Sequence, residues 1–236
     1  MITSTKVSII IPCYNYDKYL VEVVNSILLQ KVNPEVILET IIVDDCSTDK
    51  SLLIAQEIAK RFESVKVIHN EVNKKLPATR NIGIKSSNGR YIVCLDADDK
   101  VPHNYIQANF NNLSSRNLDI SYTDLQCFGD SNKTFAWPEF DLMKLRKSNY
   151  IHSSSMFKRT VWEQVGGFDE RFILGSEDYD FWLMAVKKGF KIGKCNDTLL
   201  WYRRTEQSMI ETITSKNREI VRAQLKKKHG NFYFGG

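Results

Sequence analysis

Short runs of β-branched residues alternate with helical periodicity over the first hundred residues, and this alternation restricts the fold more than any other feature of the chain. The strand-like runs are 7–11, 40–43, 65–68 and 91–95. Apolar residues at helical spacing fill the first two intervals. A third helix is expected to begin after Pro77 and to end near Asn88-Gly89, where glycine can adopt the left-handed conformation of a helix C-terminus. The pattern is typical of βαβ units and predicts an α/β fold with a largely parallel sheet.

The character of the sequence changes after Asp99. Pro102 is expected to open another helix, and a further helix should follow Ser176 and end at Gly189. The strand-like segments in this part are 120–128, 134–137, 151–158, 190–194 and 199–203. Polar loops separate several of them, which favours a mixed or antiparallel sheet. We interpret the chain as one domain with three parts, namely 1–100, 101–205 and a basic C-terminal helix in 206–236.

The composition describes a folded chain, because 42% of the 236 residues are hydrophobic and only 5 are proline, which excludes disordered and collagen-like classes. A chain of this length can bury about 70% of its unfolded surface, so it needs no disulfide or zinc site for stability. The five cysteines are scattered and include no CxxC pair, which favours a reducing compartment. Because no apolar run reaches 18 residues and the N-terminal one is too short for a signal peptide, we expect a soluble, cytoplasmic protein.

The net charge of +5 is concentrated at the end of the chain. After Thr214, Glu219 is the only acidic residue of the sequence, whereas the basic residues are Lys216, Arg218, Arg222, Lys226, Lys227 and Lys228. Such a segment can contact an anionic membrane surface or nucleic acid. On charge pattern alone, the simpler interpretation is a solvated helix face.

Acidic residues gather where two of the predicted strands end. The two groups are Asp44-Asp45 and Asp96-Ala97-Asp98-Asp99. Because the carboxyl ends of parallel strands meet at one edge of a sheet, both groups should face the same crevice. Strand alternation places Asp96 and Asp98 on one side and Ala97 on the other, and two carboxylates there suit Mg²⁺ or Mn²⁺ shared with a phosphate-bearing ligand. A single pair would be explained by turn formation, but two groups on neighbouring strands favour a site.

Two common phosphate-binding motifs are absent from the sequence. The first predicted strand is not followed by GxGxxG, and the chain contains no GxxxxGK[ST]. The first strand is instead followed by Pro12-Cys13-Tyr14-Asn15. A tyrosine in this turn can stack on a nucleotide base or simply pack over the turn, and the sequence leaves both interpretations open.

A further acidic pair, Glu177-Asp178, opens a predicted helix directly after Ser176. Carboxylates in a first helical turn complement the helix dipole, and Ser176 is a candidate N-cap, so a purely structural role explains the pair on its own. The functional alternative is a general base held at the crevice. The four histidines lie far apart and show no metal-ligand spacing; they are His69, His103, His152 and His229.

Six segments, taken together and in order, carry a family resemblance. They are VSIIIPCYNYDKYL, IIVDDCSTDKS, NKKLPATRNIGIKSSNGRYIVCLDADD, GGFDE, SEDYDFWL and WYRR. From about Val7 to about Ser208 the chain resembles the inverting glycosyltransferases of family 2, which have the GT-A fold. The resemblance implies a Rossmann-like, mostly parallel central sheet flanked by helices, with a smaller mixed or antiparallel sheet on the acceptor side. The nucleotide-sugar would then bind to 1–100 and the acceptor to 101–205.

The resemblance also assigns roles to individual residues. The nucleotide-sugar site would comprise Pro12, Tyr14, Asp44, Asp45, Asn73, Arg80, Asp96, Ala97, Arg203 and Arg204. Pro12 and Tyr14 would line the nucleotide pocket, and Asp45, with Asp44 beside it, would contact the base, commonly uracil. Asn73 and Arg80 match the Asn and Arg of the family's stretch before the third helix and would help to hold the nucleotide and its diphosphate.

By the same resemblance, Asp96 and Asp98 form a DxD element that would bind Mn²⁺ or Mg²⁺, with Asp98 the direct ligand. Asp178 matches the catalytic base and Glu177 its supporting acid, which favours the functional interpretation of that pair. The sequence departs from the family at Thr205, where many relatives have a histidine that can contact the metal or the diphosphate. A third protein ligand is therefore not identified, and Arg203 or Arg204 would hold the diphosphate instead.

The implied activity is inverting transfer of a sugar from a nucleotide-diphosphate sugar, most often a UDP-sugar, to an acceptor hydroxyl by metal-assisted direct displacement. The acceptor would be a glycan or lipid-linked glycan in bacterial surface polysaccharide synthesis, nucleic acid would not be a partner, and the basic C-terminus would contact the inner membrane leaflet. Two alternative functions predict different motifs. A sugar-1-phosphate nucleotidyltransferase should carry a GxGxRxxP-type loop where this chain has PCYNY, and a non-catalytic nucleotide-sugar-binding relative should lack the acidic base or the DxD element.

Overall fold

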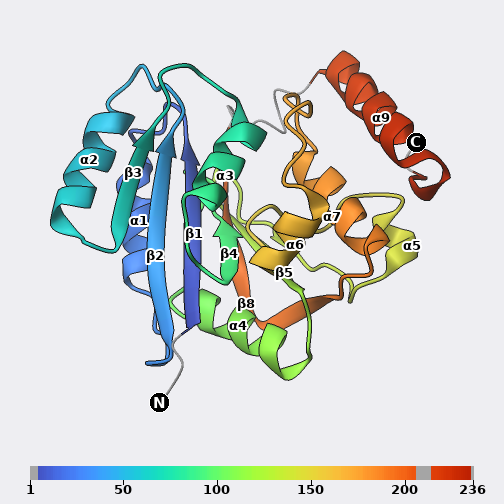
Figure 1. Cartoon of the computed structure of the whole chain (residues 1–236), viewed down its shortest axis with the longest axis horizontal. Coiled ribbons are helices and arrows are strands. Elements are labelled where there is room, and N and C mark those ends of the chain that lie inside the picture. Colours follow the sequence, from blue (N-terminus) through green and yellow to red (C-terminus); the bar gives the residue numbers. More distant parts are fainter. Residues whose placement is uncertain (1–4, 206–213, 235–236) are drawn as a thin grey trace.

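The computed structural model describes residues 5–205 and 214–234, and its centre is an eight-stranded sheet (Figure 1). The strand order is β3-β2-β1-β4-β7-β5-β6, and β8 pairs with β5. The strands are β1 (Thr5–Cys13), β2 (Val36–Asp44), β3 (Val65–His69), β4 (Tyr91–Cys94), β5 (Ile120–Gly129), β6 (Thr134–Phe135), β7 (Met156–Lys158) and β8 (Ile192–Arg204). The helices are α1 (Leu20–Leu28), α2 (Ser51–Arg61), α3 (Leu76–Lys85), α4 (Tyr105–Ser115), α5 (Leu142–Leu145), α6 (Arg159–Val165), α7 (Glu177–Lys187), α9 (Ser215–His229) and the 3₁₀ turn η1 (Gly230–Phe232).

The predicted parallel half of the sheet is confirmed. Strand β1 pairs in parallel with β2 and β4, and β2 pairs in parallel with β3. Side chains alternate between two cores: Ile9 and Ile11 of β1 pack in one, and Ile10 packs in the other. Helices α1, α2 and α4 contribute to the first core, and α3, α6, α7 and α9 contribute to the second (Figure 1). The carboxyl ends of β1, β2 and β4 therefore lie along one edge.

The end of the third predicted helix differs from expectation. Helix α3 ends at Lys85 with Ser86 as its C-cap, and Gly89 does not have a positive φ. Gly89 instead lies against β1, where a Cβ atom would overlap Ser8. The glycine is needed for this close approach and not for a helix C-terminus.

The second half is mixed, as predicted, but it is continuous with the parallel half because β7 pairs antiparallel with both β4 and β5. The predicted strand 151–158 is wrong over its first five residues, since β7 begins only at Met156, and the predicted strand 134–137 ends at Phe135. The two predicted strands 190–194 and 199–203 are one strand, β8, whose pairing with β5 shifts register at 195–198. The helix expected at Pro102 begins at Tyr105, whose N–H bonds the Pro102 carbonyl.

Helix α7 forms where it was predicted, and α9 (Ser215–His229) covers only part of the predicted basic helix. Helix α7 buries Phe181, Trp182 and Ala185 and is followed by Gly189 with a φ of 83°. Helix α9 buries Val221 and Leu225, while 206–213 and 235–236 of the predicted basic segment lie outside the described residues. Among the helices that the structure describes, none has the length and apolar character that a membrane span requires.

Candidate active site

The buried guanidinium of Arg80 joins two acidic groups that the sequence places 81 residues apart, Asp96 and Glu177. Arg80 lies on α3 and is 1% exposed. Its Nη2 donates to Asp96 Oδ1 at 2.7 Å, and its Nη1 donates to Glu177 Oε1. Burial by itself would lower the pKa of Arg80, but the two carboxylates raise it above its usual range. The predicted DxD element and the predicted catalytic pair therefore belong to one site.

Asp178 lies in the first turn of α7 with its carboxylate held from two sides. The backbone N–H of Tyr179 donates to Oδ1 at 2.7 Å, and Asn149 Nδ2 donates to Oδ2 at 3.1 Å. Burial, together with the adjacent Glu177, raises the pKa of Asp178 to about 7. A carboxylate with this pKa can accept a proton efficiently near neutral pH.

The structural explanation for the Glu177-Asp178 pair is weakened by Ser176. Ser176 occupies the N-cap position of α7, but its side chain makes no capping hydrogen bond. Its φ is 65°, a left-handed conformation that is uncommon outside glycine, and Gly175 before it has a φ of 107°. The strained entry into the helix is a feature that functional sites often contain.

Asp98 is the carboxylate of the DxD element that remains available. Asp96 accepts from Arg80 and, at 3.2 Å, from Ser153 Oγ. Within the described residues no side-chain donor reaches Asp98. Burial and the neighbouring Asp96 together raise the pKa of Asp98 to about 7. Because Asp98 lies beside the Asp96 carboxylate and lacks such donors in the described part of the chain, a cation would stabilise its charged form.

The acidic residue that follows, Asp99, has a different position. It is 1% exposed and accepts a hydrogen bond from the Arg203 backbone N–H at 2.8 Å. In the part of the chain that the structure describes, no three His, Cys, Asp or Glu side chains gather as a metal site. A cation here would therefore need water or phosphate oxygens to complete its shell, as Mg²⁺ commonly does.

The predicted nucleotide end lies at the carboxyl ends of β1 and β2. Asp45 accepts hydrogen bonds from Asn70 Nδ2 and the Lys74 backbone N–H, both at 2.8 Å, and from the Lys75 backbone N–H at 2.9 Å. It therefore shapes the loop that carries Asn73. The remaining residues differ in exposure: Pro12, Asp44 and Ala97 are buried, whereas Tyr14 is 44% exposed.

The two arginines of the WYRR segment are not equivalent. Arg203 Nε donates to the Asp98 carbonyl at 2.8 Å, its Nη2 pairs with Glu22, and its guanidinium lies 4.3 Å from the Tyr19 ring centre. This guanidinium is already engaged on the α1 face of the sheet. Arg204 lies with its guanidinium 5.9 Å from the Tyr202 ring centre.

Sequence reasoning missed the contribution of 149–155, because most of this segment has the pattern of a strand. Asn149 reaches Asp178 and Ser153 reaches Asp96, so the segment contacts both halves of the site. His152, between them in the sequence, is half-buried, and desolvation lowers its pKa to about 4, which keeps the imidazole neutral. The polar run His152-Ser153-Ser154-Ser155 inside a predicted strand was the one available signal.

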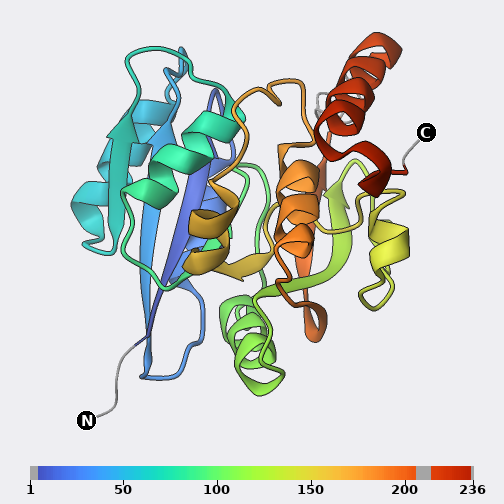
Figure 2. The same cartoon turned by 45° about the vertical axis from the view of Figure 1, so that its right-hand side comes forward.

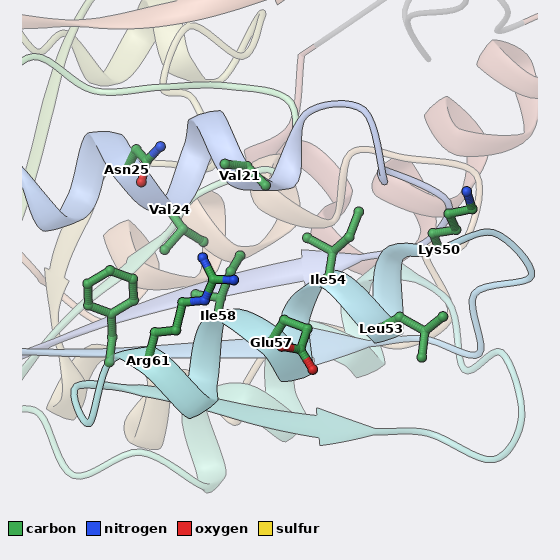
Figure 3. Close-up of a pocket in the computed structure, with 10 residues that line it drawn as sticks. Val21, Val24, Asn25, Lys50, Leu53, Ile54, Glu57, Ile58 and Arg61 are labelled. Carbon is green, nitrogen blue, oxygen red and sulfur yellow. The ribbon is translucent and has the colours of Figure 1, made fainter.

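An apolar hollow of about 490 Å³ lies elsewhere, between α1 and α2 (Figure 3). Its walls include Val21, Val24, Leu53 and Ile58. None of the candidate catalytic or metal-binding residues lines it. Lys50, Glu57 and Arg61 also line the hollow. The connected carboxylates that acid–base and metal chemistry require lie instead at Asp96, Glu177 and Asp178, so we take that cluster as the candidate active site.

The chain belongs to glycosyltransferase family 2, because the model of "Glycosyl transferase family 2" matches residues 8–176. The putative teichuronic acid biosynthesis glycosyltransferase TuaG of Bacillus subtilis is 30% identical over 210 residues, covering 86% of this chain and 81% of TuaG. The chain spans 63%, 80% and 81% of the lengths of three bacterial relatives.

Solved structures identify the fold as GT-A. Staphylococcus aureus TarS 1-349 in complex with UDP-GlcNAc matches 94% of this chain and 67% of that one with a TM-score of 0.75 and 18% identity. The mannosyltransferase PcManGT from Pyrobaculum calidifontis, in complex with GDP-Man and Mn²⁺, matches 87% of this chain and 59% of that one with a TM-score of 0.68 and 18% identity. The α/β fold expected from the family resemblance is therefore confirmed.

Proposed function

We propose that this glycosyltransferase is an inverting enzyme that moves a sugar from a nucleotide-diphosphate sugar to an acceptor hydroxyl. The observation that carries the proposal is one connected set of groups. Asp178, with a pKa raised to about 7, follows Glu177, which Arg80 links to the Asp96–Asp98 pair. A base and a site for diphosphate charge are the two requirements of a direct displacement.

In the proposed reaction, Asp178 accepts the proton of the acceptor hydroxyl as that oxygen attacks the anomeric carbon. Asn149 and the Tyr179 N–H hold the carboxylate, so its orientation is set before the acceptor arrives. Attack opposite the leaving diphosphate gives a single displacement, which inverts the anomeric centre. Glu177 is the acidic residue that supports the base. Its bond to Arg80 fixes the start of α7, where Asp178 lies.

The oxygen ligands at Asp96 and Asp98 fit a hard divalent cation, because both side chains offer carboxylate oxygens. Among the described residues, no side chain donates a hydrogen bond to the Asp98 carboxylate. Asp98, with Asp96, would hold Mn²⁺ or Mg²⁺, which when bound acts as a Lewis acid toward the diphosphate. Arg80 balances part of the carboxylate charge at the same place. The solved complex of PcManGT with Mn²⁺ supports the choice of metal.

We propose a UDP-sugar as the donor and a glycan or lipid-linked glycan of the bacterial cell surface as the acceptor. The TarS complex with UDP-GlcNAc supports the first choice, and the similarity to TuaG, a putative teichuronic acid biosynthesis glycosyltransferase, supports the second. Pro12, Tyr14, Asp45 and Asn73 would form the nucleotide end. Arg203 or Arg204, at the end of β8, would hold the diphosphate.

We also propose a cytoplasmic location with a peripheral membrane contact through α9. All five cysteines are unpaired, in keeping with a reducing compartment. The basic residues exposed on α9 are Lys216, Arg218, Arg222, Lys226 and Lys227. Lys228 does not belong to this exposed set, because its ammonium pairs with Asp169 and Asp180.

A panel of nucleotide-sugars with Mn²⁺ tests the proposed function. We expect one donor, a UDP-sugar, to raise the thermal unfolding temperature and to release nucleoside diphosphate. A parallel reaction with a nucleoside triphosphate and a sugar 1-phosphate tests the alternative, because release of inorganic diphosphate there would identify a nucleotidyltransferase. Binding without release of either product, with a range of glycan acceptors present, would identify a non-catalytic relative.

A further inference from the structure

Two acidic residues in the segments that carry the family resemblance have no part in the proposed reaction. Asp169 belongs to GGFDE, and Asp180 lies two residues after Asp178 on α7. Asp180 is only 1% exposed. A buried carboxylate is costly unless it is paired and hydrogen-bonded, so the fold must supply Asp180 with partners.

Both partners of Asp180 come from α9, which lies beside α7 (Figure 2). Lys228 Nζ lies 2.7 Å from Asp180 Oδ2, and His229 Nε2 lies 2.8 Å from Asp180 Oδ1. The same Lys228 ammonium lies 2.8 Å from Asp169 Oδ2. One lysine thus joins α9 to α7 and to the GGFDE segment that precedes it.

A second contact connects the C-terminal part of the chain to the same turn of α7. The rings of Tyr233 and Tyr179 meet edge to face with centroids 5.8 Å apart. Tyr179 is the residue whose backbone N–H holds Asp178. Its hydroxyl also donates to the Leu145 carbonyl at 2.6 Å. Tyr179, in the turn that carries Asp178, is therefore held by Tyr233 from later in the chain and by Leu145 from earlier in the chain.

We propose that α9 is a positioning element for catalysis: Lys228 and His229 fix Asp180 and thereby the orientation of Asp178. The proposal rests on the proposed function, in which Asp178 is the base. Lys228 touches neither donor nor acceptor in this scheme, so it is a positioning residue. Its loss should slow proton transfer, which requires close alignment, and leave the donor site on β1, β2 and β4 intact.

The test compares Lys228→Met with Lys228→Arg and with Lys66→Met, which removes an exposed lysine of β3. We expect Lys228→Met to lower kcat for transfer at least tenfold with the donor KM unchanged. Lys228→Arg should recover most of kcat, because a guanidinium can bridge two carboxylates. Lys66→Met should match the wild type. All rates are measured well below the unfolding temperature of each variant.

A merely structural role predicts a different pattern. If Lys228→Met lowers the unfolding temperature while its kcat equals that of Lys66→Met, the inference is overturned. If Lys228→Met does not fold, the pair Asp180→Asn with Lys228→Met, which leaves no unpaired charge at Asp180, replaces it, and a wild-type kcat would again overturn the inference. A wild-type chain without transfer activity toward any donor contradicts the proposed function itself, which separates the two failures.

Discussion

Asp178 depends on a side chain that is 29 residues away in the sequence. Asn149 donates to its charged form, and a donor to the charged form lowers a carboxyl pKa. Among the described residues, the other groups acting on this carboxylate are Glu177, Arg80 and the Tyr179 N–H. Asn149 is thus one of the groups that hold the pKa of the base near neutrality.

Asn149→Ala should raise the pKa of Asp178 above about 7. Because the base must be ionised, transfer falls as the pH drops through that pKa. The acidic limb of the kcat profile should therefore move to higher pH by about one unit, which corresponds to the free energy of one hydrogen bond to a charged group. The profile of kcat against pH at saturating donor measures this. Asn111→Ala, on the exposed side of α4, is the control, and a variant with the wild-type profile would remove Asn149 from the site.

Asp98→Ala should abolish the metal-dependent part of donor affinity. The variant loses the carboxylate that has no side-chain donor within the described residues, so Mn²⁺ should no longer improve binding. Titration calorimetry of the donor with Mn²⁺ and with chelator measures the difference. Asp130→Ala, an exposed carboxylate, should behave as wild type. A persistent tenfold effect of Mn²⁺ in Asp98→Ala would assign the metal to other ligands.

The acidic residues of the site can be placed from the sequence, but their partners cannot. The strand-end pattern is enough to locate Asp96 and Asp98, whereas Asp178 needs the family resemblance as well, because a carboxylate at a helix start also has a structural explanation. Asn149 and Ser153 show no such pattern, because their function depends on contacts 29 and 57 residues away. Spacing along the chain carries no information about such contacts.

At the scale of elements, α3 sets the position of Arg80 through close packing on the sheet. Gly83, one turn after Arg80, lies where a Cβ atom would overlap Ile10 of β1. Gly83→Ala should therefore force the helix and strand apart and lower the free energy of unfolding by about 1–3 kcal/mol. Urea denaturation measures the change. Lys85→Ala, exposed on the same helix, is the matched control, and equal stability of the two variants would contradict the packing argument.

The outer face of α9 makes a separate prediction. Lys226→Gln with Lys227→Gln should weaken binding to vesicles that contain anionic lipid on the order of 30-fold, since each basic residue near such a surface contributes about 1 kcal/mol. Vesicle sedimentation measures the binding. Lys60→Gln with Lys85→Gln removes the same charge from other exposed positions. Equal binding of the two double variants would rule out α9 as the contact.

The elements also show where sequence patterns fail. Strands β1, β2 and β4 are predictable because their apolar β-branched runs are buried on both faces of the sheet, whereas the edge strand β3 is only partly buried. The segment 151–155 has a strand-like sequence but is not a strand, because its backbone carbonyls bond side chains: Trp182 Nε1 donates to Ile151 and Tyr105 OH donates to Ser154. Those donors satisfy the backbone without a neighbouring strand, and they lie on α7 and α4.

At the scale of the whole molecule, the fold brings charges of opposite sign to different places. The carboxylates of the site lie at strand ends and at the start of α7, and the exposed basic residues of α9 lie toward the C-terminus (Figure 1). The net charge of +5 describes neither region. The DxD element follows β4, in the parallel half of the sheet. The segment 149–155, which contacts the proposed base Asp178, leads directly into β7 of the same sheet.

The most direct test of the account is transfer by Asp178→Asn, measured beside donor binding with Mn²⁺. We expect the donor Kd to stay within about twofold of wild type, because Asp178 serves the acceptor, while transfer falls by about 10²–10⁴, the usual contribution of a general base. Thermal unfolding shows whether the variant is folded. Wild-type transfer by a folded Asp178→Asn would contradict the assignment of the base and, with it, the proposed mechanism.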